Sequence, residues 1–474
     1  MRRFLSVFII IIMDLSLILC GCESGQIDRG KELKNVMDTC DSKWSQAFPT
    51  GTASFPQVAD YIAGWGGNAG LEVTKNAEHY IVLTNPATKG QKKSPSVTMC
   101  ISLDPVKLRD SFKLLSLGMT SILGPVEHGR IRLIVAEDSE HGYPGAESIN
   151  SKYLKCDHFI YIYKGSSGMA YTAGPMSAQG KLSCKAGRTS PKYENAFRIS
   201  IQIPSTLNPY NYDKDSSLPN PINVLGDLLA SAKSSGRLFE IASFTAKDNG
   251  DFLPCEAKAV VVIDDNNVEA FQKRFESSSE ALQKRFDELE VNKDEDGNPI
   301  EGFTYTMEPI SVPKKVLKQS ASDNIISLMY TLQTGIHLQD EDTGSITACS
   351  YIRSVSTKGG KFALVMDMRS RDTESMEEMS GNYLITSGLC DVNYSSTEPH
   401  RLWSSTKDSS LAAWFLATVN DEGDDPTTLQ SSECDKLYAK KQGLDMSAYR
   451  YDKDHRGTAL ENILSYLTSL SVQN

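Results

Sequence analysis

The chain has 474 residues, of which 40% are hydrophobic and 23% are charged, so it is a folded globular protein too long for one hydrophobic core. Its formal net charge of −11 at pH 7 argues against a nucleic-acid partner. We therefore expect two domains and a partner other than DNA or RNA.

The N-terminus has the pattern of a lipoprotein signal peptide. Arg2-Arg3 precedes an apolar run from Phe4 to Leu19, which leads into Cys20-Gly21-Cys22. The run is shorter than the ~20 apolar residues of a membrane-spanning helix, and Asp14 interrupts it. Because a small residue stands just before Cys22, we expect cleavage there and lipidation of Cys22.

Lipidation at Cys22 predicts a compartment as well as an anchor. We expect the mature protein to be held on a membrane of the bacterial cell envelope, at the outer membrane or cell surface rather than in the cytoplasm. Removal of residues 1–21 takes away Arg2, Arg3 and Asp14 and leaves 47 basic and 59 acidic residues, a net charge of −12.

Eight cysteines remain after residue 22, and an even count in an exported chain permits disulfide bonds. No two of them are spaced as Cys-x-x-Cys, which argues against a zinc ribbon or a thioredoxin-type site. Their pairing does not follow from spacing. They are Cys40, Cys100, Cys156, Cys184, Cys255, Cys349, Cys390 and Cys434.

The first part of the chain has an α/β pattern. The segment Val36 to Leu71 is rich in helix signals, and Leu108 to Leu123 reads as a helix between strands. The strand runs are continuously apolar, which favours a buried and largely parallel sheet. They are Tyr80 to Leu83, Val97 to Leu103, Ile131 to Val135 and Phe159 to Ile162.

The middle of the chain changes pattern. Phe197 to Ile203 alternates strictly between apolar and polar residues, as in a sheet with one solvated face. We therefore expect a smaller α+β domain at 196–393, inserted into an α/β domain formed by 22–195 and 394–474. Further elements are predicted at Ala257 to Ile263, Val268 to Leu289, Phe362 to Met368, Asp408 to Val419 and Thr458 to Leu467.

Four motifs, in order, resemble those of one peptidase family. They are Gln57 to Val73, Asn85-Pro-Ala-Thr-Lys-Gly90, Leu253-Pro-Cys-Glu-Ala257 and Met368-Arg-Ser370. Together they are similar to the aminoacyl-histidine dipeptidases among the di-zinc aminopeptidases and carboxypeptidases. The resemblance implies a three-layer α/β/α domain with an inserted α+β lid, through which two copies pair.

The metal ligands that the resemblance implies are largely replaced in this chain. The His-x-Asp motif of the family falls on Ser102 and Asp104, so its first zinc ligand is a serine here. The loop that supplies the bridging aspartate has no counterpart in the shorter segment from Pro105 to Ser116. The Glu-Glu pair of general base and ligand falls on Ser139 and Glu140, which keeps only the ligand.

Two further ligand positions differ in the same way. The carboxylate that ends the next strand of the family falls on Tyr163, and the loop carrying the distal histidine is missing before Thr458. In the lid, the histidine that reaches the substrate matches Tyr210, and the lid arginine matches Arg369. Arg369 is either a receptor for a carboxylate or an exposed charge at the end of a strand.

We therefore predict a membrane-anchored pseudopeptidase that binds a peptide or protein partner and carries no cofactor. Asp104 and Ser139 would be vestigial catalytic positions, and Ser102, Glu140 and Tyr163 vestigial metal positions. The alternative is an active dipeptidase with zinc at a rearranged site. Such a site would draw on Glu137, Asp138, Glu140, His141, Asp157 and His158.

Overall fold

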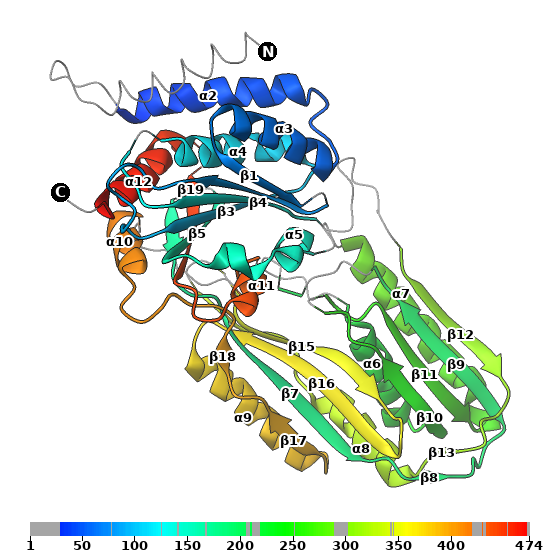
Figure 1. Ribbon diagram of the computed structural model, residues 1–474. Coiled ribbons are helices and arrows are strands. Elements are labelled where there is room, and N and C mark those ends of the chain that lie inside the picture. The colour runs from blue at the N-terminus through cyan, green and yellow to red at the C-terminus, as the bar shows by residue number, and fades with distance from the viewer. Residues whose placement is uncertain are drawn as a thin grey trace. The chain divides into compact units, whose positions relative to one another are not determined.

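The computed structural model (Figure 1) divides the chain into two compact units. Unit 1 comprises Met1–Gly174, Leu402–Thr427 and Ser432–Asn474, and unit 2 comprises Pro175–Arg401 and Thr428–Ser431. Cys22, the signal peptide at 1–21, Glu140 and His141 lie outside the described residues. Those described are 29–76, 78–124, 126–139, 142–165, 168–204, 209–210, 219–250, 252–288, 302–341, 344, 346–419, 429, 433–452 and 454–471.

The sheet of unit 1 has seven strands in the order β1-β2-β4-β3-β5-β19-β6. The four central strands, β4, β3, β5 and β19, are parallel, whereas β1, β2 and β6 add antiparallel pairs at its sides. The bounds are β1 Glu72–Asn76, β2 Tyr80–Asn85, β3 Val97–Leu103, β4 Ile131–Glu137, β5 His158–Gly165, β6 Met169–Tyr171 and β19 Met446–Asp452.

Helices cover both faces of this sheet, which confirms the predicted three-layer arrangement. Packed on one face are α3 (Phe55–Asn68), α4 (Leu108–Ile122), α10 (Ser410–Val419) and α12 (Arg456–Ser469), and α2 (Arg29–Ala47) lies outside them on α4 and α12. The other face packs against α5 (Pro144–Ser148), the short helix η1 (Ser151–Leu154) and α11 (Glu433–Lys440).

Strand β3 shows how the sequence produces this layering. Val97, Met99 and Ile101 point into the core under α4, because alternate side chains of a strand share a face. Cys100 and Ser102 therefore point to the face of α5 and α11, and Cys100 is fully buried there. Ser102, which the resemblance predicts at a zinc-ligand position, thus lies beneath α11.

Unit 2 contains the same fold twice. One lobe runs β9 (Asn195–Gln202), α6 (Pro221–Ser234), β10 (Phe239–Ala246), β11 (Glu256–Ile263), α7 (Val268–Glu288) and β12 (Thr304–Ile310). The other runs β7 (Met176–Lys185), α8 (Gln319–Thr331), β15 (Ile346–Ser356), β16 (Lys361–Ser370), α9 (Thr373–Leu389) and β17 (Asn393–Ser396). Both are β-α-β-β-α-β units of the ferredoxin-like type.

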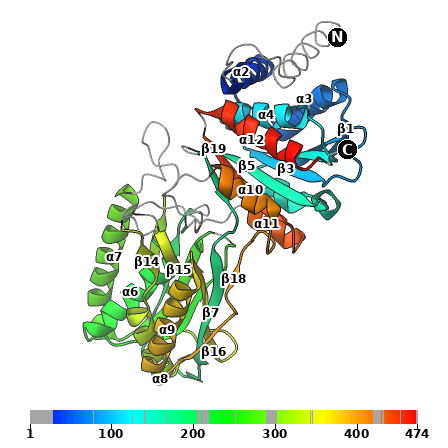
Figure 2. The same cartoon turned by 90° about the vertical axis from the view of Figure 1, so that its left-hand side faces the viewer.

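The two lobes share one sheet, in the order β12-β9-β11-β10-β15-β16-β7-β17. Counted within each lobe, the strand order is 4-1-3-2 and then its mirror, 2-3-1-4, so the second strands β10 and β15 meet in the middle. They pair antiparallel at Ala246 and Val355. All four helices pack on one face around a common core (Figure 2).

Shorter strands complete unit 2. Strand β14 (Gly335–Gln339) pairs with β15, β18 (His400–Arg401) pairs with β7, and β8 (Arg188–Thr189) pairs with β13 (Val316–Leu317). Strand β7 belongs to this sheet because it pairs with β16 along ten residues, although the expected boundary at 195/196 assigned it to the first domain.

Two further features were left open by the sequence. All eight cysteines of the described residues are free thiols. Among those residues, no helix combines the length and the apolar character needed to cross a bilayer.

Candidate functional site

The candidate site lies where the parallel strands of unit 1 end. We call this the carboxyl edge: β3 ends at Leu103, β4 at Glu137 and β19 at Asp452. In α/β proteins, ligands bind at this edge because loops and side chains converge there. Asp138 N donates to Leu103 O at 2.7 Å, so the segments after β3 and β4 lie side by side.

The structure places Ser102 of β3 beside a buried carboxyl that the sequence analysis missed, that of Glu433. Glu433 begins α11, is 2% exposed, and accepts a hydrogen bond from the hydroxyl of Tyr161 on β5. Burial and the nearby Asp138 raise the pKa of Glu433 to about 8, against the neighbouring hydroxyls of Ser102 and Tyr161, which lower it. Glu433 is therefore mainly protonated at pH 7.

Asp138 is the second perturbed carboxyl at this edge. Burial raises its pKa to about 6; the Ser139 N–H, donating at 2.7 Å, lowers it, and the charge of Asp104 raises it. The hydroxyl of Ser139 donates to Gly142 O at 3.2 Å, and Asp104 Oδ1 accepts from Val106 N at 2.9 Å. Ser139 and Asp104 thus stabilise the turns that follow β4 and β3.

A stack of tyrosines occupies the neighbouring strands. Tyr163 lies between Tyr161, at 5.9 Å between ring centroids, and Tyr171 of β6, at 6.1 Å. Burial raises the pKa of Tyr161 and of Tyr163 well above the usual value, so both phenols are neutral. Arg450 of β19 lies over the ring of Tyr171 at 5.6 Å.

Two histidines reach the carboxyl edge, and each contacts a neighbouring carboxylate. His79 Nδ1 lies 2.5 Å from Glu137 Oε2, and His455 Nδ1 lies 2.6 Å from Asp452 Oδ2. Within the described part of the chain, no three His, Cys, Asp or Glu side chains come close enough to hold one metal ion. The donors beside Ser102 are hydroxyls, phenols, a protonated carboxyl and the single carboxylate of Asp138, and this set has too few ionised ligands for a di-zinc cage.

The residues considered for a rearranged metal site are split between the two edges of the sheet. Asp138 follows β4 at the carboxyl edge, whereas Asp157 and His158 begin β5 beside Val97. Seven residues of strand separate the two edges, roughly 20 Å at about 3.3 Å per residue. Asp157 accepts from Ser96, so the members of this set among the described residues, which exclude Glu140 and His141, do not converge.

In unit 2, the two lid residues singled out from the sequence contact each other. Arg369 lies over the Tyr210 ring at 4.2 Å, and the Tyr210 hydroxyl donates to Asp367 at 2.8 Å. Arg369 Nη1 also donates to Leu429 O at 3.0 Å. Arg369 is only 4% exposed, so the alternative of an exposed charge at a strand end is wrong.

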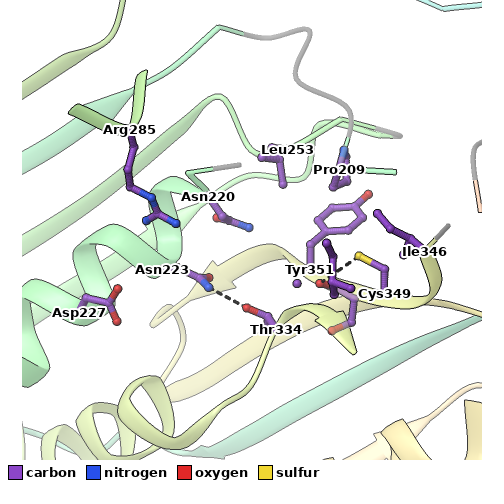
Figure 3. Close-up of a pocket in the computed structure, with 13 residues that line it drawn as sticks. Pro209, Asn220, Asn223, Asp227, Leu253, Arg285, Thr334, Ile346, Cys349 and Tyr351 are labelled. Carbon is purple, nitrogen blue, oxygen red and sulfur yellow. Dashed lines mark hydrogen bonds between the residues drawn. The ribbon is translucent and has the colours of Figure 1, made fainter. Parts of the chain in front are cut away.

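A pocket of about 170 Å³ opens in unit 2 next to this pair (Figure 3). Arg285 and Asp227 stand on one side, and Leu253, Ile346 and Cys349 on the other. The ring of Tyr351 forms part of the wall and packs edge-to-face on Tyr210 at 5.4 Å. The pocket therefore combines an exposed charged rim with an apolar wall. Its lining also includes Pro209, Asn220, Asn223, Thr334, Gly335, Ile336 and Ser350.

Asn223 gives the pocket a hydrogen-bond acceptor. Its side-chain nitrogen donates to Thr334 Oγ1 at 2.7 Å, while its oxygen is buried without a hydrogen-bond partner among the described residues. An unpaired buried acceptor is costly unless a donor reaches it, so this oxygen favours a ligand with an N–H or O–H group.

Comparison with known proteins addresses the fold. No protein-family model matches the chain, and neither does any curated protein. Among solved structures, aminoacylhistidine dipeptidase from Vibrio alginolyticus matches with a TM-score of 0.50 and 14% identity, over 90% of this chain and 95% of that one. The predicted resemblance is therefore confirmed for the fold, a peptidase-like α/β/α domain with a second α+β domain.

Two further structures are similar at lower scores. Aminopeptidase PepT from Bacillus cereus has a TM-score of 0.44 and 10% identity, over 92% of this chain and 98% of that one. A tripeptidase from Staphylococcus aureus has a TM-score of 0.43 and 10% identity, over 95% of this chain and 100% of that one.

Proposed function

We propose that the chain is a membrane-anchored lipoprotein of the cell envelope that binds a peptide or protein partner on a peptidase-like fold without hydrolysing it. The observation that carries this proposal is the state of Glu433. Its carboxyl is buried, mainly protonated at neutral pH and hydrogen-bonded to Tyr161 next to Ser102.

Metal-assisted hydrolysis needs ionised ligands and a general base with a pKa near the working pH. Ser102 and Ser139 supply neutral hydroxyls at the positions where the resemblance implies a ligand and a base. Tyr163 supplies a neutral phenol at a third position. These groups can hold each other and can donate hydrogen bonds to a ligand, but they do not activate water.

The pocket of unit 2 is the part of the chain best suited to a peptide ligand. Arg285 can pair with a carboxylate, and Asn223 can accept from a backbone amide. Leu253 and Tyr351 provide an apolar surface for one side chain. A short peptide or a terminal residue of a protein partner fits this combination of groups.

The alternative is an active zinc-dependent dipeptidase with a rearranged site. His79 and Glu137, paired at the carboxyl edge, are the groups that favour it. The fold shared with aminoacylhistidine dipeptidase is compatible with either function.

Metal content and turnover separate the two functions. The mature chain carrying Cys22→Ser would be equilibrated with zinc, dialysed, and assayed for bound metal and for hydrolysis of β-alanyl-histidine and other dipeptides. We expect neither stoichiometric zinc nor turnover. The proposal would be refuted, in favour of the rearranged enzyme, if the protein bound zinc and hydrolysed a dipeptide and if His79→Ala abolished both.

Binding is tested on the same protein. We expect members of a dipeptide panel to raise its melting temperature and to lose this effect in Arg285→Gln. Arg198→Gln, at an exposed arginine of unit 2 outside the pocket, serves as the matched control. Equal effects in both variants would refute a peptide site in this pocket.

A further inference from the structure

We propose that the opposite, amino edge of the unit-1 sheet is a basic surface that docks on anionic lipid headgroups, an inference that rests on the proposed lipid anchor at Cys22. The amino edge is where β3, β4 and β5 begin. Its exposed cations come from three loops that precede these strands. They are Lys89, Lys92, Lys93, Arg130, Lys152 and Lys155.

Hydrogen bonds to backbone carbonyl groups hold these three loops together. Arg130 Nη2 donates to Lys155 O at 3.5 Å, which joins the loops before β4 and β5. Asp157 N and His158 N both donate to Ser96 O at 3.1 Å, which joins the loops before β5 and β3. The six cations therefore belong to one surface although they are dispersed in the sequence.

The same edge extends toward β19 with more lysines. Phe159 N donates to Asp445 O at 2.8 Å, and Thr406 Oγ1 donates to Asp445 Oδ1 at 3.0 Å. Exposed Lys407 and Lys440 are close to these contacts in the chain. The surface thus borders the C-terminal end of α11 and the segment before α10.

The carboxylates at this edge do not cancel its charge. Asp157 is hydrogen-bonded to Ser96, and Asp445 contacts His158 at 3.0 Å. Glu127 and Asp408 add two more negative charges, against eight cations. Because charges beyond a Debye length of about 10 Å are screened, the local excess of cations decides the interaction rather than the net charge of the chain.

The position of the first residue of α2 indicates on which side of unit 1 the lipid anchor lies. Asp41 of α2 contacts Ser116 of α4 at 2.6 Å, and Trp44 stacks on Phe112 at 6.5 Å, so the two helices are antiparallel. Arg29, the first residue of α2, therefore lies toward the end of α4 at Ile122.

The end of α4 belongs to the amino edge. Ile122 O accepts from Asn85 Nδ2 at 2.9 Å, and Asn85 is paired with Ile131, the first residue of β4. Six residues lie between Cys22 and Arg29, and the seven Cα–Cα steps from one to the other span at most about 25 Å. A lipid at Cys22 keeps the bilayer within that reach of Arg29, and Arg29 lies toward the amino edge.

Docking in this way gives unit 1 an orientation on the membrane. Anionic headgroups attract each Lys or Arg near the surface, so the amino edge turns toward the bilayer. Glu433 and Tyr161 lie near the other end of the strands and face away from the lipid. The candidate site is then open to ligands from the aqueous phase.

The test uses the mature chain with Cys22→Ser, so that binding does not depend on lipidation. Its sedimentation with phosphatidylcholine vesicles is compared with and without 40 mol% phosphatidylglycerol, at 20, 150 and 500 mM NaCl. The surface variant is Lys92→Gln/Lys93→Gln/Lys155→Gln. The matched control is Lys181→Gln/Lys358→Gln/Lys361→Gln, which removes the same charge from exposed lysines of unit 2.

We expect binding to phosphatidylglycerol vesicles at 20 mM NaCl, loss of binding at 500 mM, and none to phosphatidylcholine alone. Each lysine removed from the surface should weaken binding about 5-fold, so the surface variant should lose on the order of 100-fold. The control should bind like the parent. Equal binding by parent and surface variant, or an equal loss in the control, would overturn the inference.

Two further measurements identify the ligand of the basic surface and test the lipid anchor separately. Binding of DNA or heparin at 150 mM NaCl by a protein that ignores the vesicles would overturn the lipid assignment. Mass spectrometry of the full-length protein extracted from membranes reports on Cys22 separately. An unmodified Cys22 would refute the anchor and the orientation built on it, while the vesicle result would still stand for the isolated surface.

Discussion

Replacement of Glu433 by glutamine should make the stability of unit 1 nearly independent of pH between pH 6 and pH 8. Glutamine has the shape of the protonated glutamic acid and can still accept from Tyr161, but it has no proton to lose. The wild-type carboxyl has a pKa of about 8 in the folded chain, against an ordinary value of 4.5. The folded state therefore keeps a proton that the unfolded chain has released.

The sign and size of the effect follow from this difference. Wherever the folded state binds more protons than the unfolded state, the free energy of unfolding falls as the pH rises. From pH 6 to pH 8 the two pKa values of Glu433 give a loss of about 2 kcal/mol at ~1.4 kcal/mol per unit. Asp138, with a pKa of about 6, has the same sign but titrates mainly below this window.

Urea unfolding followed by tryptophan fluorescence measures this loss in unit 1 alone. The four tryptophans, Trp44, Trp65, Trp403 and Trp414, all belong to unit 1. We expect the wild-type protein to lose about 2 kcal/mol from pH 6 to pH 8 and Glu433→Gln to lose about 0.5 kcal/mol or less, the remainder due to Asp138.

The matched control is Glu147→Gln, because the side chain of Glu147 is 60% exposed. This variant should keep the wild-type pH dependence. The reasoning is refuted if Glu433→Gln retains the full loss between pH 6 and pH 8. It is also refuted if the wild-type protein becomes more stable over this window, because an ionised Glu433 would then be the favoured folded form.

Three other substitutions test packing and buried charge. Gly145→Ala should cost about 1–3 kcal/mol in the tryptophan-monitored transition, since its Cβ would lie 2.4 Å from the backbone nitrogen of Glu137. Gly64→Ala, with open space around its Cβ, should instead stabilise by about 0.5–1 kcal/mol, and equal effects would contradict this reading. Arg369→Met should cost about 3–5 kcal/mol in urea unfolding followed by circular dichroism, because buried Asp367 would lose one of its two arginines and keep Arg353, at 3.6 Å, beside the Tyr210 hydroxyl. A cost below about 1 kcal/mol would refute a structural role of that pair.

Much of the fold could be predicted because its strands are continuous apolar runs. The run Val97–Leu103 is strand β3 with the expected bounds. The strand expected at Ile131 to Val135 is two residues longer and ends at Glu137. Such runs bury both faces of a parallel strand, so their signal does not depend on distant residues. The predicted helix at Thr458 to Leu467 is the core of α12 for a similar reason.

Strand β19 was not predicted, although it completes the centre of the unit-1 sheet. Its sequence, Met446 to Asp452, mixes polar and aromatic residues, and its burial comes from β5 and β6, which lie far away in the chain. Tertiary context here overrides a weak local pattern. The repeat of two lobes in unit 2 was also missed, because equal topology does not require similar sequence.

The buried acid of the candidate site has an equally weak signal. Glu433 precedes Cys434 and Leu437, whose spacing places one helix face in the core. A charged residue at the first position of such a helix is usually a solvated cap. The contact with Tyr161, at a separation of 272 residues, brings Glu433 into the core, where burial raises its pKa to about 8.

The motifs that carry the family resemblance stabilise the fold of this chain. Gln57 accepts from Ser54 N at 2.9 Å and caps α3, and Thr88 Oγ1 accepts from His128 N at 3.0 Å in the turn after β2. Arg369 holds Asp367 in the core of unit 2. None of these residues belongs to the carboxyl edge, where the chemistry of a peptidase would take place. Because the motifs specify packing, they predict the fold and leave the reaction undetermined, and the activity must be argued from Ser102 and Glu433.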